Sequence, residues 1–253
     1  MRLAGRTISL RRPWLVGILN ITPDSFWQGS RVAGSAALHQ AAEAMVEAGA
    51  DLLDVGGEST RPGADEVSEQ EELDRVLPAI ELLRAAFAAP LSIDTRRAGV
   101  ARAALAAGAV MVNDVSGFAD PAMADVVRGA DAAWVLMDMP HAVGQMAWSR
   151  RTEQTPADLT AGVETVVERL EDAIARAVAA GVERGQLAVD PGIGFGKSVA
   201  QNLFFLRRMG PLARLKLPVY IGPSRKSFLA SISDAPVESR LMGTAAAVTA
   251  AIL

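Results

Sequence analysis

The stretch Ala107-Gly108-Ala109-Val110-Met111-Val112-Asn113 carries the pattern that decides the fold: a helix-favouring run, a glycine turn, and a short apolar run ending on a polar residue. The pattern recurs at 48–55 and at 180–190, with Gly49 and Gly181 in the turns. Glycine is favoured just past a helix end because other residues meet a Cβ clash in the left-handed conformation. Each copy therefore predicts a helix end followed by a strand.

Seven short apolar runs, separated by helical patterns, are predicted strands. They lack strict alternation of apolar and polar residues, which indicates burial on both faces of a parallel sheet. The runs are 15–19, 52–55, 91–93, 110–112, 134–137, 187–189 and 219–221. Because strands and helices alternate, we expect an α/β fold, a TIM (β/α)8 barrel forming a single domain over residues 1–253. We expect residues 1–10 to form a small hairpin that closes the bottom of the barrel.

The count of strands is one short of eight. The chain stops at Leu253, inside a helix-like run that begins at Thr244. A seven-stranded barrel would expose unpaired backbone groups along two edges, which favours aggregation. We hypothesise that the eighth βα unit is missing because the sequence is truncated; an intact mass of the natural product matching 253 residues would refute this.

Composition excludes several classes of function. A formal net charge of −4 argues against a nucleic-acid partner, which requires a basic face. The absence of cysteine excludes disulfides, thiolate metal sites and cysteine nucleophiles, and suits a cytoplasmic location. No apolar stretch reaches the roughly 18 residues that span a bilayer, so no membrane partner is expected.

Polar residues follow most of the predicted strands. In a TIM barrel the carboxyl ends of the strands meet at one mouth, where the active site is built. The residues are Asn20, Glu58, Asp94, Asn113-Asp114, Asp138, Asp190 and Ser224-Arg225-Lys226. An open doubly wound sheet, the alternative architecture, would divide them around a switch point.

Four of the loops that follow these strands favour binding of a planar, anionic substrate. The Asn20 carbonyl suits Mg²⁺, and the run Gly56 to Ala64 offers Thr60 and Arg61 to a diphosphate. Asp190 precedes a glycine-rich loop that fits neither nucleotide-binding fingerprint, yet its carboxylate suits two parallel N–H donors such as a guanine-like or pterin edge presents. Ser224-Arg225-Lys226-Ser227 follows the seventh run, where barrels often bind anions. For each loop the alternative interpretation is an ordinary capping turn or a solvated charge.

Six motifs, taken together and in order, resemble the successive signatures of the dihydropteroate synthase family. They are Gly17-Ile18-Leu19-Asn20-Ile21-Thr22-Pro23-Asp24-Ser25-Phe26, Asp54 to Ala64, Ser92-Ile93-Asp94-Thr95, Val112-Asn113-Asp114-Val115-Ser116-Gly117, Asp190 to Lys197, and Ser224-Arg225-Lys226-Ser227. The resemblance implies a homodimeric barrel, assisted by Mg²⁺, that acts in folate biosynthesis. It implies a transferase that joins 6-hydroxymethyl-7,8-dihydropterin diphosphate to p-aminobenzoate, giving 7,8-dihydropteroate and diphosphate.

The resemblance also implies roles for individual residues. Asn20 would bind the metal beside the diphosphate, which Thr60 and Arg61 would also meet. The pterin would be bound by Asp94, Asn113, Asp190 and Gly222, with Met137 and Phe195 along its faces and Lys226 at its carbonyl side. The p-aminobenzoate pocket, which sulfonamides also occupy, would be shaped by Phe26, Pro62 and Ser227. The catalytic residues implied are Lys226, Asp94 and Arg61.

Three departures from the family pattern put activity in question. The family reads Ser-Asp-Gly-Gly where this chain has Trp27-Gln28-Gly29-Ser30. It favours Leu-Met-His-Met-Gln-Gly where this chain has Leu136-Met137-Asp138-Met139-Pro140-His141, so the histidine's role is not carried to Asp138. The family's last strand, with its diphosphate-binding Arg and His, has no counterpart before Leu253. A pterin-binding paralogue without turnover and a pterin-dependent methyltransferase therefore remain as alternatives.

Overall fold

The computed structural model describes residues 1–3, 5–21, 31–60, 64–140, 149–150, 152–233 and 236–252. Six parallel strands form the central sheet, and neighbours in the sheet are neighbours in the chain. The strands are β3 Val16–Asn20, β4 Leu52–Gly56, β5 Leu91–Asp94, β6 Met111–Asp114, β7 Ala133–Met137 and β8 Leu187–Asp190. The parallel α/β fold predicted from the sequence is therefore confirmed.

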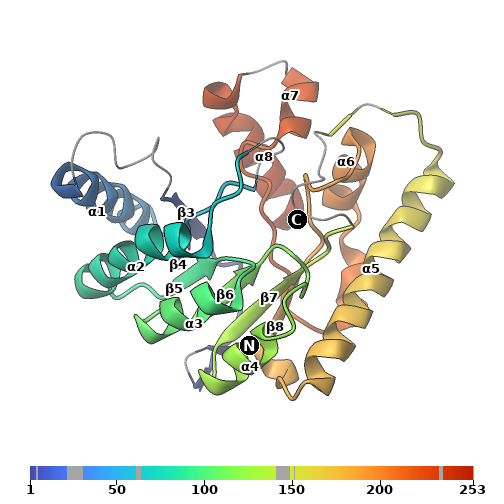
Figure 1. Cartoon of the computed structure of the whole chain (residues 1–253). Helices are drawn as coiled ribbons and strands as arrows, with labels where there is room; N and C mark the ends of the chain where they lie inside the picture. Colours follow the sequence, from blue (N-terminus) through green and yellow to red (C-terminus); the bar gives the residue numbers. More distant parts are fainter. Residues whose placement is uncertain are drawn as a thin grey trace.

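Helices α1 to α6 lie on the outer face of the curved sheet, and helices α7 and α8 pack against α6 (Figure 1). They are α1 Arg31–Glu47, α2 Glu69–Ala86, α3 Ala98–Ala106, α4 Met123–Gly129, α5 Pro156–Ala179, α6 Val199–Arg207, α7 Ser227–Ser233 and α8 Leu241–Ile252. Capping boxes begin α2, α5 and α6, with Ser68, Thr155 and Ser198 accepting from the backbone three residues on. Across the described residues, no helix has the length and apolar character needed to cross a membrane.

The glycines of the repeated pattern take the conformation predicted for them. Gly49, Gly108 and Gly181 have φ values of 96°, 115° and 88°, in the left-handed region. Each turns the chain from a helix end into the strand that follows, where buried apolar residues such as Leu53, Val112 and Val189 pack beneath the helices. Helix–sheet packing is thus the main core of the molecule.

The seventh predicted strand, 219–221, is wrong as a strand. Val219 forms only an isolated parallel bridge with Val189, although the segment runs beside β8. The Val189 amide donates to the Pro218 carbonyl at 3.0 Å, and the Tyr220 amide donates to the Val189 carbonyl at 2.8 Å. Pro218 has no amide hydrogen to extend this ladder. Among the described strands β3 pairs with β4 alone, and Ile18 and Val219 are 40% and 39% exposed.

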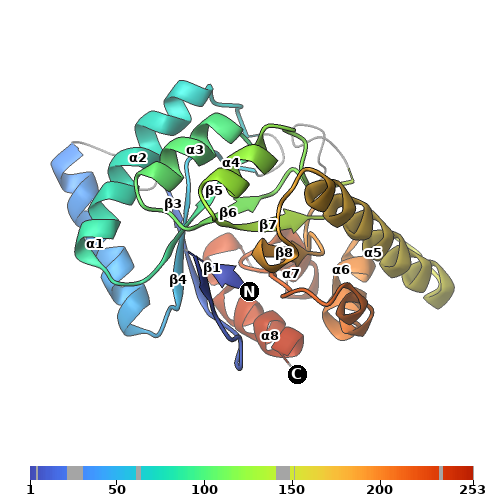
Figure 2. The same cartoon turned by 90° about the horizontal axis from the view of Figure 1, so that it is seen from below.

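A short hairpin closes the end of the sheet opposite the strands' carboxyl ends (Figure 2). Its antiparallel strands are β1 Arg2–Leu3 and β2 Arg6–Thr7, within the predicted range 1–10. Leu3 packs against Leu52 and Met111, at the starts of their strands. Arg2 donates to Glu183 at 2.6 Å and to Asp131 at 2.9 Å, which fastens the hairpin to the turns at this end. The expected hairpin is confirmed.

Candidate active site

Strand register places three of the expected site residues at one level of the sheet. Asn20 is aligned with Gly56, Gly56 with Asp94, and Asp94 with Asn113. Glycine at position 56 keeps the space between its neighbours open, because a Cβ there would lie 3.6 Å from Asp94 Oδ2 and 3.7 Å from Asn20 Oδ1. The two oxygens therefore converge on the same space at the carboxyl ends of the strands.

These converging oxygens fit the modest protein contribution that Mg²⁺ requires. Mg²⁺ is usually held by one or two protein oxygens, with water and substrate phosphates completing its shell. In the described part of the chain no group of three or more His, Cys, Asp or Glu side chains could hold a metal by itself. The donor set suits a metal that arrives with a phosphorylated substrate rather than a closed structural site.

A buried carboxylate, Asp54, joins three other segments beneath this level. Its Oδ1 accepts from Ser92 Oγ at 2.5 Å, and its Oδ2 accepts from Asn113 Nδ2 at 3.0 Å and from Tyr220 Oη at 3.4 Å. Because Asp54 engages the Asn113 amide nitrogen, the amide orientation is set and Asn113 Oδ1 remains as an acceptor for a ligand. Burial raises the pKa of Asp54, and its hydrogen bonds oppose that shift.

Asp94 lies at the same opening and is held near other carboxylates. Its pKa is raised well above the ordinary value, first by desolvation and then by the charges of Asp54 and Glu72. Asp94 keeps part of its surface open to solvent, which moderates the shift. Lys226 opposes it.

Asp190, at the end of β8, and Lys226, just before α7, both contact the loop that follows β8. The Gly192 amide donates to Asp190 Oδ1 at 2.7 Å, and Lys226 Nζ donates to the Ile193 carbonyl. Lys226 Nζ also lies 3.9 Å from the centroid of the Phe195 ring. Glycine is needed at position 194, with φ of 83°, because a Cβ there would lie 2.3 Å from Lys226 Cδ.

Burial brings the pKa values of Asp190 and Lys226 toward neutrality. Desolvation raises the pKa of Asp190 to about 6, against the positive charge of Lys226. Desolvation lowers the pKa of Lys226 to about 8, against the negative charges of Asp190 and Asp94. Both groups are charged between these values, so they present a carboxylate and an ammonium to the same ligand.

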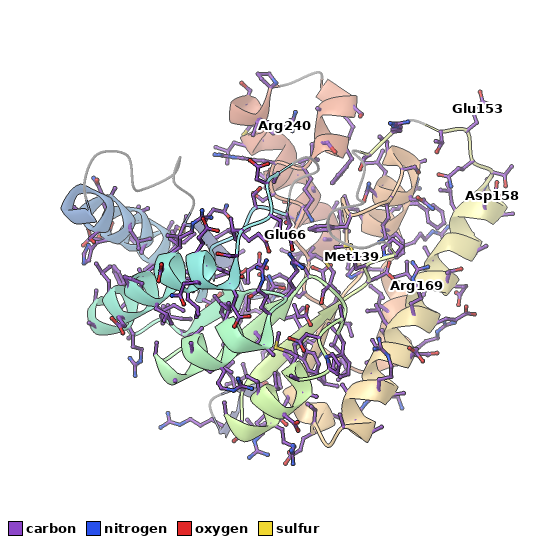
Figure 3. All side chains as sticks on the ribbon, in the orientation of Figure 1. Glu66, Met139, Glu153, Asp158, Arg169 and Arg240 are labelled. Atoms are coloured by element: carbon purple, nitrogen blue, oxygen red, sulfur yellow. The ribbon has the colours of Figure 1, made fainter. Side chains whose placement is uncertain are left out.

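A network of ion pairs braces the segment that carries Thr60. Glu58 Oε2 lies 3.1 Å from Arg96 Nε and 3.0 Å from Arg97 Nη1, and Arg97 also contacts the fully buried Glu72. Arg97 Nη2 donates to the Val67 carbonyl at 2.6 Å. The two ends of the β4–α2 connection are thereby tied to the start of α3. Glu66 of this connection, labelled in Figure 3, also contacts Arg96, although its side chain is 73% exposed.

The structure places most of the predicted site residues near this opening. Met137 is aligned with Asp190 in the sheet, a Cβ on Gly222 would lie 3.9 Å from Lys226 Nζ, and Ser227 begins α7. Arg61, Phe26, Pro62, His141 and the Trp27-Gln28 pair lie outside the described residues. His39, in α1, is half-buried with its ring 5.0 Å from that of Phe87.

Sequence reasoning missed the residues that support the site from behind. Tyr220 was predicted only as part of a strand, and no role was predicted for Asp54, although it lies in a quoted motif. The chain's single tyrosine within an apolar run was the available signal, since a buried hydroxyl needs a partner. Lys197 was treated only as the position that fails the glycine fingerprint.

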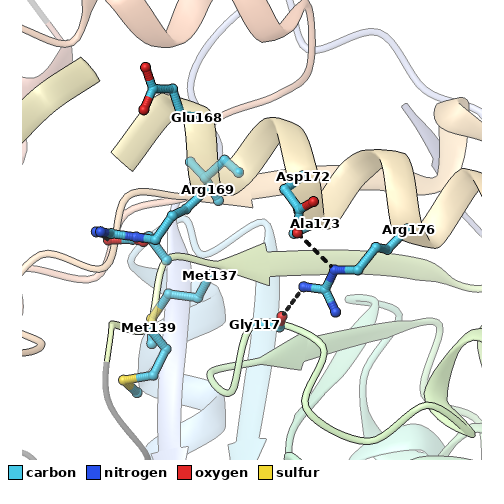
Figure 4. Close-up of a pocket in the computed structure, with 10 residues that line it drawn as sticks. Gly117, Met137, Met139, Glu168, Arg169, Asp172, Ala173 and Arg176 are labelled. Atoms are coloured by element: carbon cyan, nitrogen blue, oxygen red, sulfur yellow. Dashed lines mark hydrogen bonds and ion pairs between the residues drawn. The ribbon is translucent and has the colours of Figure 1, made fainter. Parts of the chain in front are cut away.

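A separate cavity of about 340 Å³ lies between α5, β7 and the segment after β6 (Figure 4). Met137, Met139 and Arg169 lie on one side of it, and Gly117 and Arg176 on the other. Arg176 donates to Asp172 at 3.0 Å and to the Gly117 carbonyl at 3.4 Å, so its charge is already satisfied. The cavity borders the expected site at Met137 without containing its carboxylates.

Comparison with known proteins agrees with this geometry. The family model described as "Pterin binding enzyme" matches residues 16–253. Dihydropteroate synthase from Synechocystis sp. is 43% identical over 248 residues, covering 96% of this chain and 82% of that protein.

Solved structures of two further dihydropteroate synthases are similar throughout. The Xanthomonas albilineans enzyme with 4-aminobenzoic acid has a TM-score of 0.86 at 41% identity, covering 99% of this chain and 88% of that one. Its complex with 7,8-dihydropteroate has a TM-score of 0.83 at 39% identity, covering 100% and 89%. A Yersinia pestis sulfonamide drug complex has a TM-score of 0.87 at 36% identity, covering 99% and 89%. This chain therefore belongs to the dihydropteroate synthase family of pterin-binding enzymes.

Proposed function

We propose that this chain is a dihydropteroate synthase, a transferase of folate biosynthesis that joins 6-hydroxymethyl-7,8-dihydropterin diphosphate to p-aminobenzoate. The observation that carries the proposal is the convergence of Asn20, Asp94 and Asn113 at one level of the sheet, with Asp190 and Lys226 at the same opening. A flat ring with donors on one edge and a carbonyl on the other matches carboxylates opposed by an ammonium.

Binding and orientation of the pterin are assigned to the buried groups. Asp190 accepts from the ring N–H and exocyclic amine, Asn113 offers its oxygen, and Lys226 donates to the ring carbonyl. Lys226 leaves the Ile193 carbonyl when the substrate supplies a better acceptor. Met137 and Phe195 lie along the ring faces, with the Gly222 backbone beside them.

The reaction breaks the bond between the pterin methylene carbon and the diphosphate oxygen, and the electron pair leaves with diphosphate. The lone pair of the p-aminobenzoate nitrogen then forms the new carbon–nitrogen bond, and the proton released passes to diphosphate or water. An aryl amine is neutral near pH 7, so no strong general base is needed. Asp94 stabilises the positive charge that develops on the ring and methylene.

Charge on the departing diphosphate is met by Thr60, Arg61 and the neighbourhood of Asn20. Mg²⁺ bound through Asn20 supplies positive charge there. Phe26, Pro62 and Ser227 form the p-aminobenzoate pocket, which also accepts sulfonamides. We further propose a cytoplasmic homodimer in which residues 1–253 form a single TIM-barrel domain.

A direct assay tests the proposal. Purified protein is supplied with the pterin diphosphate and Mg²⁺, with and without p-aminobenzoate, and diphosphate release is measured. Release that depends on p-aminobenzoate is expected. Pterin binding without release would instead identify a paralogue without turnover. The replacement of the family histidine by Asp138 makes this alternative worth testing. Transfer of a methyl group from a reduced folate would identify the methyltransferase alternative.

Lys226→Ala gives the matched test of the site. We expect loss of turnover by about two to three orders of magnitude, because one preorganised electrostatic contact commonly contributes on the order of 3 kcal/mol to the barrier. Lys216→Asn is the control, since it removes an exposed lysine at a left-handed position that asparagine tolerates. Near-normal turnover in Lys226→Ala would remove Lys226 from its role.

A further inference from the structure

Asp138, the residue that departs from the family pattern, is the centre of a buried charge cluster. It follows β7 and is 3% exposed. On one side Arg169 of α5 donates from Nε to Oδ1 at 2.6 Å and from Nη2 to Oδ2 at 2.9 Å. On the other side Lys197 Nζ lies 2.8 Å from Oδ2. The Arg169 side chain is 42% exposed, whereas that of Lys197 is 5% exposed.

The buried half of this cluster leads directly to Asp190. Lys197 Nζ donates to the Gly192 carbonyl at 3.1 Å, and the Gly192 amide donates to Asp190 Oδ1 at 2.7 Å. The backbone of Asp138 takes part as well, because its amide donates to the Asp190 carbonyl at 2.8 Å. Gly192 is confined between these groups, since a Cβ there would lie 2.2 Å from the Asp138 carbonyl oxygen.

A carboxylate at position 138 is what allows Lys197 to remain buried and charged. A lysine ammonium withdrawn from water requires a counter-charge in contact with it. A histidine at this position has no negative charge to offer. Asp138 therefore changes the electrostatics of the loop compared with the family pattern, and three hydrogen bonds, through Lys197 and Gly192, connect its carboxylate to that of Asp190.

We propose that Asp138 and Lys197 are positioning residues for Asp190: Lys197 holds the loop by the Gly192 carbonyl and places a positive charge beside the pterin-binding carboxylate, and Asp138 keeps that charge in place. The inference rests on the proposed function, because it concerns how Asp190 meets the pterin.

The charges around Asp190 and Lys197 determine in which direction the pKa of Asp190 shifts when Lys197 is replaced. The pKa of Asp190 is influenced by the charges of Lys226 from the segment before α7, Lys197 from its own loop and Asp138 from the end of β7. Asp190 in turn raises the pKa of Tyr220. Lys197 is influenced by Asp138, Asp190 and Arg169. Lys197 lowers the pKa of Asp190, and Asp138 raises it. Removing the Lys197 charge alone therefore raises the pKa of Asp190 above about 6.

Two variants separate the charge of Lys197 from its hydrogen bond. Lys197→Met removes both, whereas Lys197→Gln removes the charge but keeps an N–H donor for the Gly192 carbonyl. In each variant Asp138 retains Arg169 as a partner, so no buried charge is left alone. Lys197→Arg keeps the charge, and Lys216→Asn is the control for losing a lysine elsewhere.

The measurement is calorimetric binding of pteroic acid as a function of pH. For the wild type we expect affinity to fall as the pH drops through about 6, as Asp190 takes up a proton. In Lys197→Met and Lys197→Gln this midpoint moves upward by roughly one pH unit. Above the midpoint Lys197→Met binds about tenfold more weakly than Lys197→Gln, because only the glutamine still holds the Gly192 carbonyl. Lys197→Arg and Lys216→Asn keep the wild-type midpoint.

Two results would overturn the inference in distinguishable ways. Wild-type protein that binds no pteroic acid at any pH would overturn the proposed function and this inference with it. Wild-type binding combined with an unmoved midpoint in both Lys197→Met and Lys197→Gln would overturn the inference alone. A loss of affinity at every pH with no shift would mean that the loop is only structural.

Discussion

At the scale of single residues, the opening holds more buried carboxylates than cations. Asp94 and Asp190 both act on the charge of Lys226, and Asp54 acts on Asp94. Burial raises the pKa of each of the three carboxyl groups. Motifs at strand ends predicted Asp94, Asn113, Asp190 and Lys226, because parallel strands bring their carboxyl ends together. They could not predict the hydrogen bond between Tyr220 and Asp54, whose positions differ by 166 in the sequence.

We predict a bell-shaped pH dependence for pterin affinity in the wild type. Binding needs Asp190 ionised, which holds above about 6, and Lys226 protonated, which holds below about 8. Affinity should therefore be highest between these values and fall on both sides. Calorimetric titration with pteroic acid across this range checks it, and a basic limb that persists in Lys226→Met would exclude Lys226 as its source.

Asp190→Asn should weaken pterin binding without destabilising the fold. The folded-state pKa of about 6 lies above the ordinary value of 3.8, so the ionised carboxylate lowers stability above pH 6, and this penalty disappears as the pH falls through 6 toward 4. Asparagine removes the penalty and can still accept from the Gly192 amide. At neutral pH we expect at least tenfold weaker pteroic acid binding and an undiminished melting temperature. A large drop in melting temperature would contradict the prediction.

At the scale of elements, the sequence pattern predicted the six paired strands, the helical segments between them and the glycine turns past three helix ends, but not the capping boxes that begin α2, α5 and α6. Glycines past helix ends carry their own signal, because their requirement for positive φ is local. Whether an apolar run becomes a paired strand depends on its neighbours. The 219–221 run has the composition of a strand, yet it meets Val189 in a single bridge after Pro218.

Gly49 and Gly192 allow a comparison of backbone strain with steric exclusion. Both have positive φ, but a Cβ on Gly49 would meet nothing within 4 Å, whereas one on Gly192 would lie 2.2 Å from the Asp138 carbonyl oxygen. Gly49→Ala should lower the free energy of unfolding by about 1 kcal/mol and leave pteroic acid affinity unchanged. Gly192→Ala should lower both the free energy of unfolding and the affinity. Urea denaturation measures the stability of both variants, and calorimetry measures their affinity for pteroic acid. Equal effects of Gly49→Ala and Gly192→Ala would refute the prediction.

Arg97 should prove essential to the start of α3. Arg97→Met leaves the buried Glu72 without its cation, which should lower the free energy of unfolding at neutral pH by about 3 kcal/mol. Desolvation raises the pKa of Glu72, so the loss should shrink as the pH falls and Glu72 takes up a proton. Urea denaturation at several pH values measures this. Arg102→Met, on the exposed face of α3, is the control and should change stability by less than about 0.5 kcal/mol.

At the scale of the whole molecule, the Asp54 hydrogen bonds link strands β4, β5 and β6 to the segment before α7 that carries Tyr220. Tyr220, the single tyrosine, reports on that assembly. Burial and the charges of Asp54 and Asp94 raise its pKa well above 10. Ultraviolet titration should show no tyrosinate until the protein unfolds, and an ordinary midpoint near about 10 in urea. Ionisation of Tyr220 at its ordinary pH in the folded protein would show that the contact does not persist in solution.

The β1–β2 hairpin, which Arg2 joins to Glu183 and Asp131 by hydrogen bonds, covers the end of the sheet opposite the proposed substrate site. A tether joined at its Gly5 turn would hold the molecule from underneath and leave the entrance facing solution. Protein immobilised this way on a sensor chip should thus take up pterins as freely as it does unattached, which makes the hairpin the natural handle for screening inhibitors.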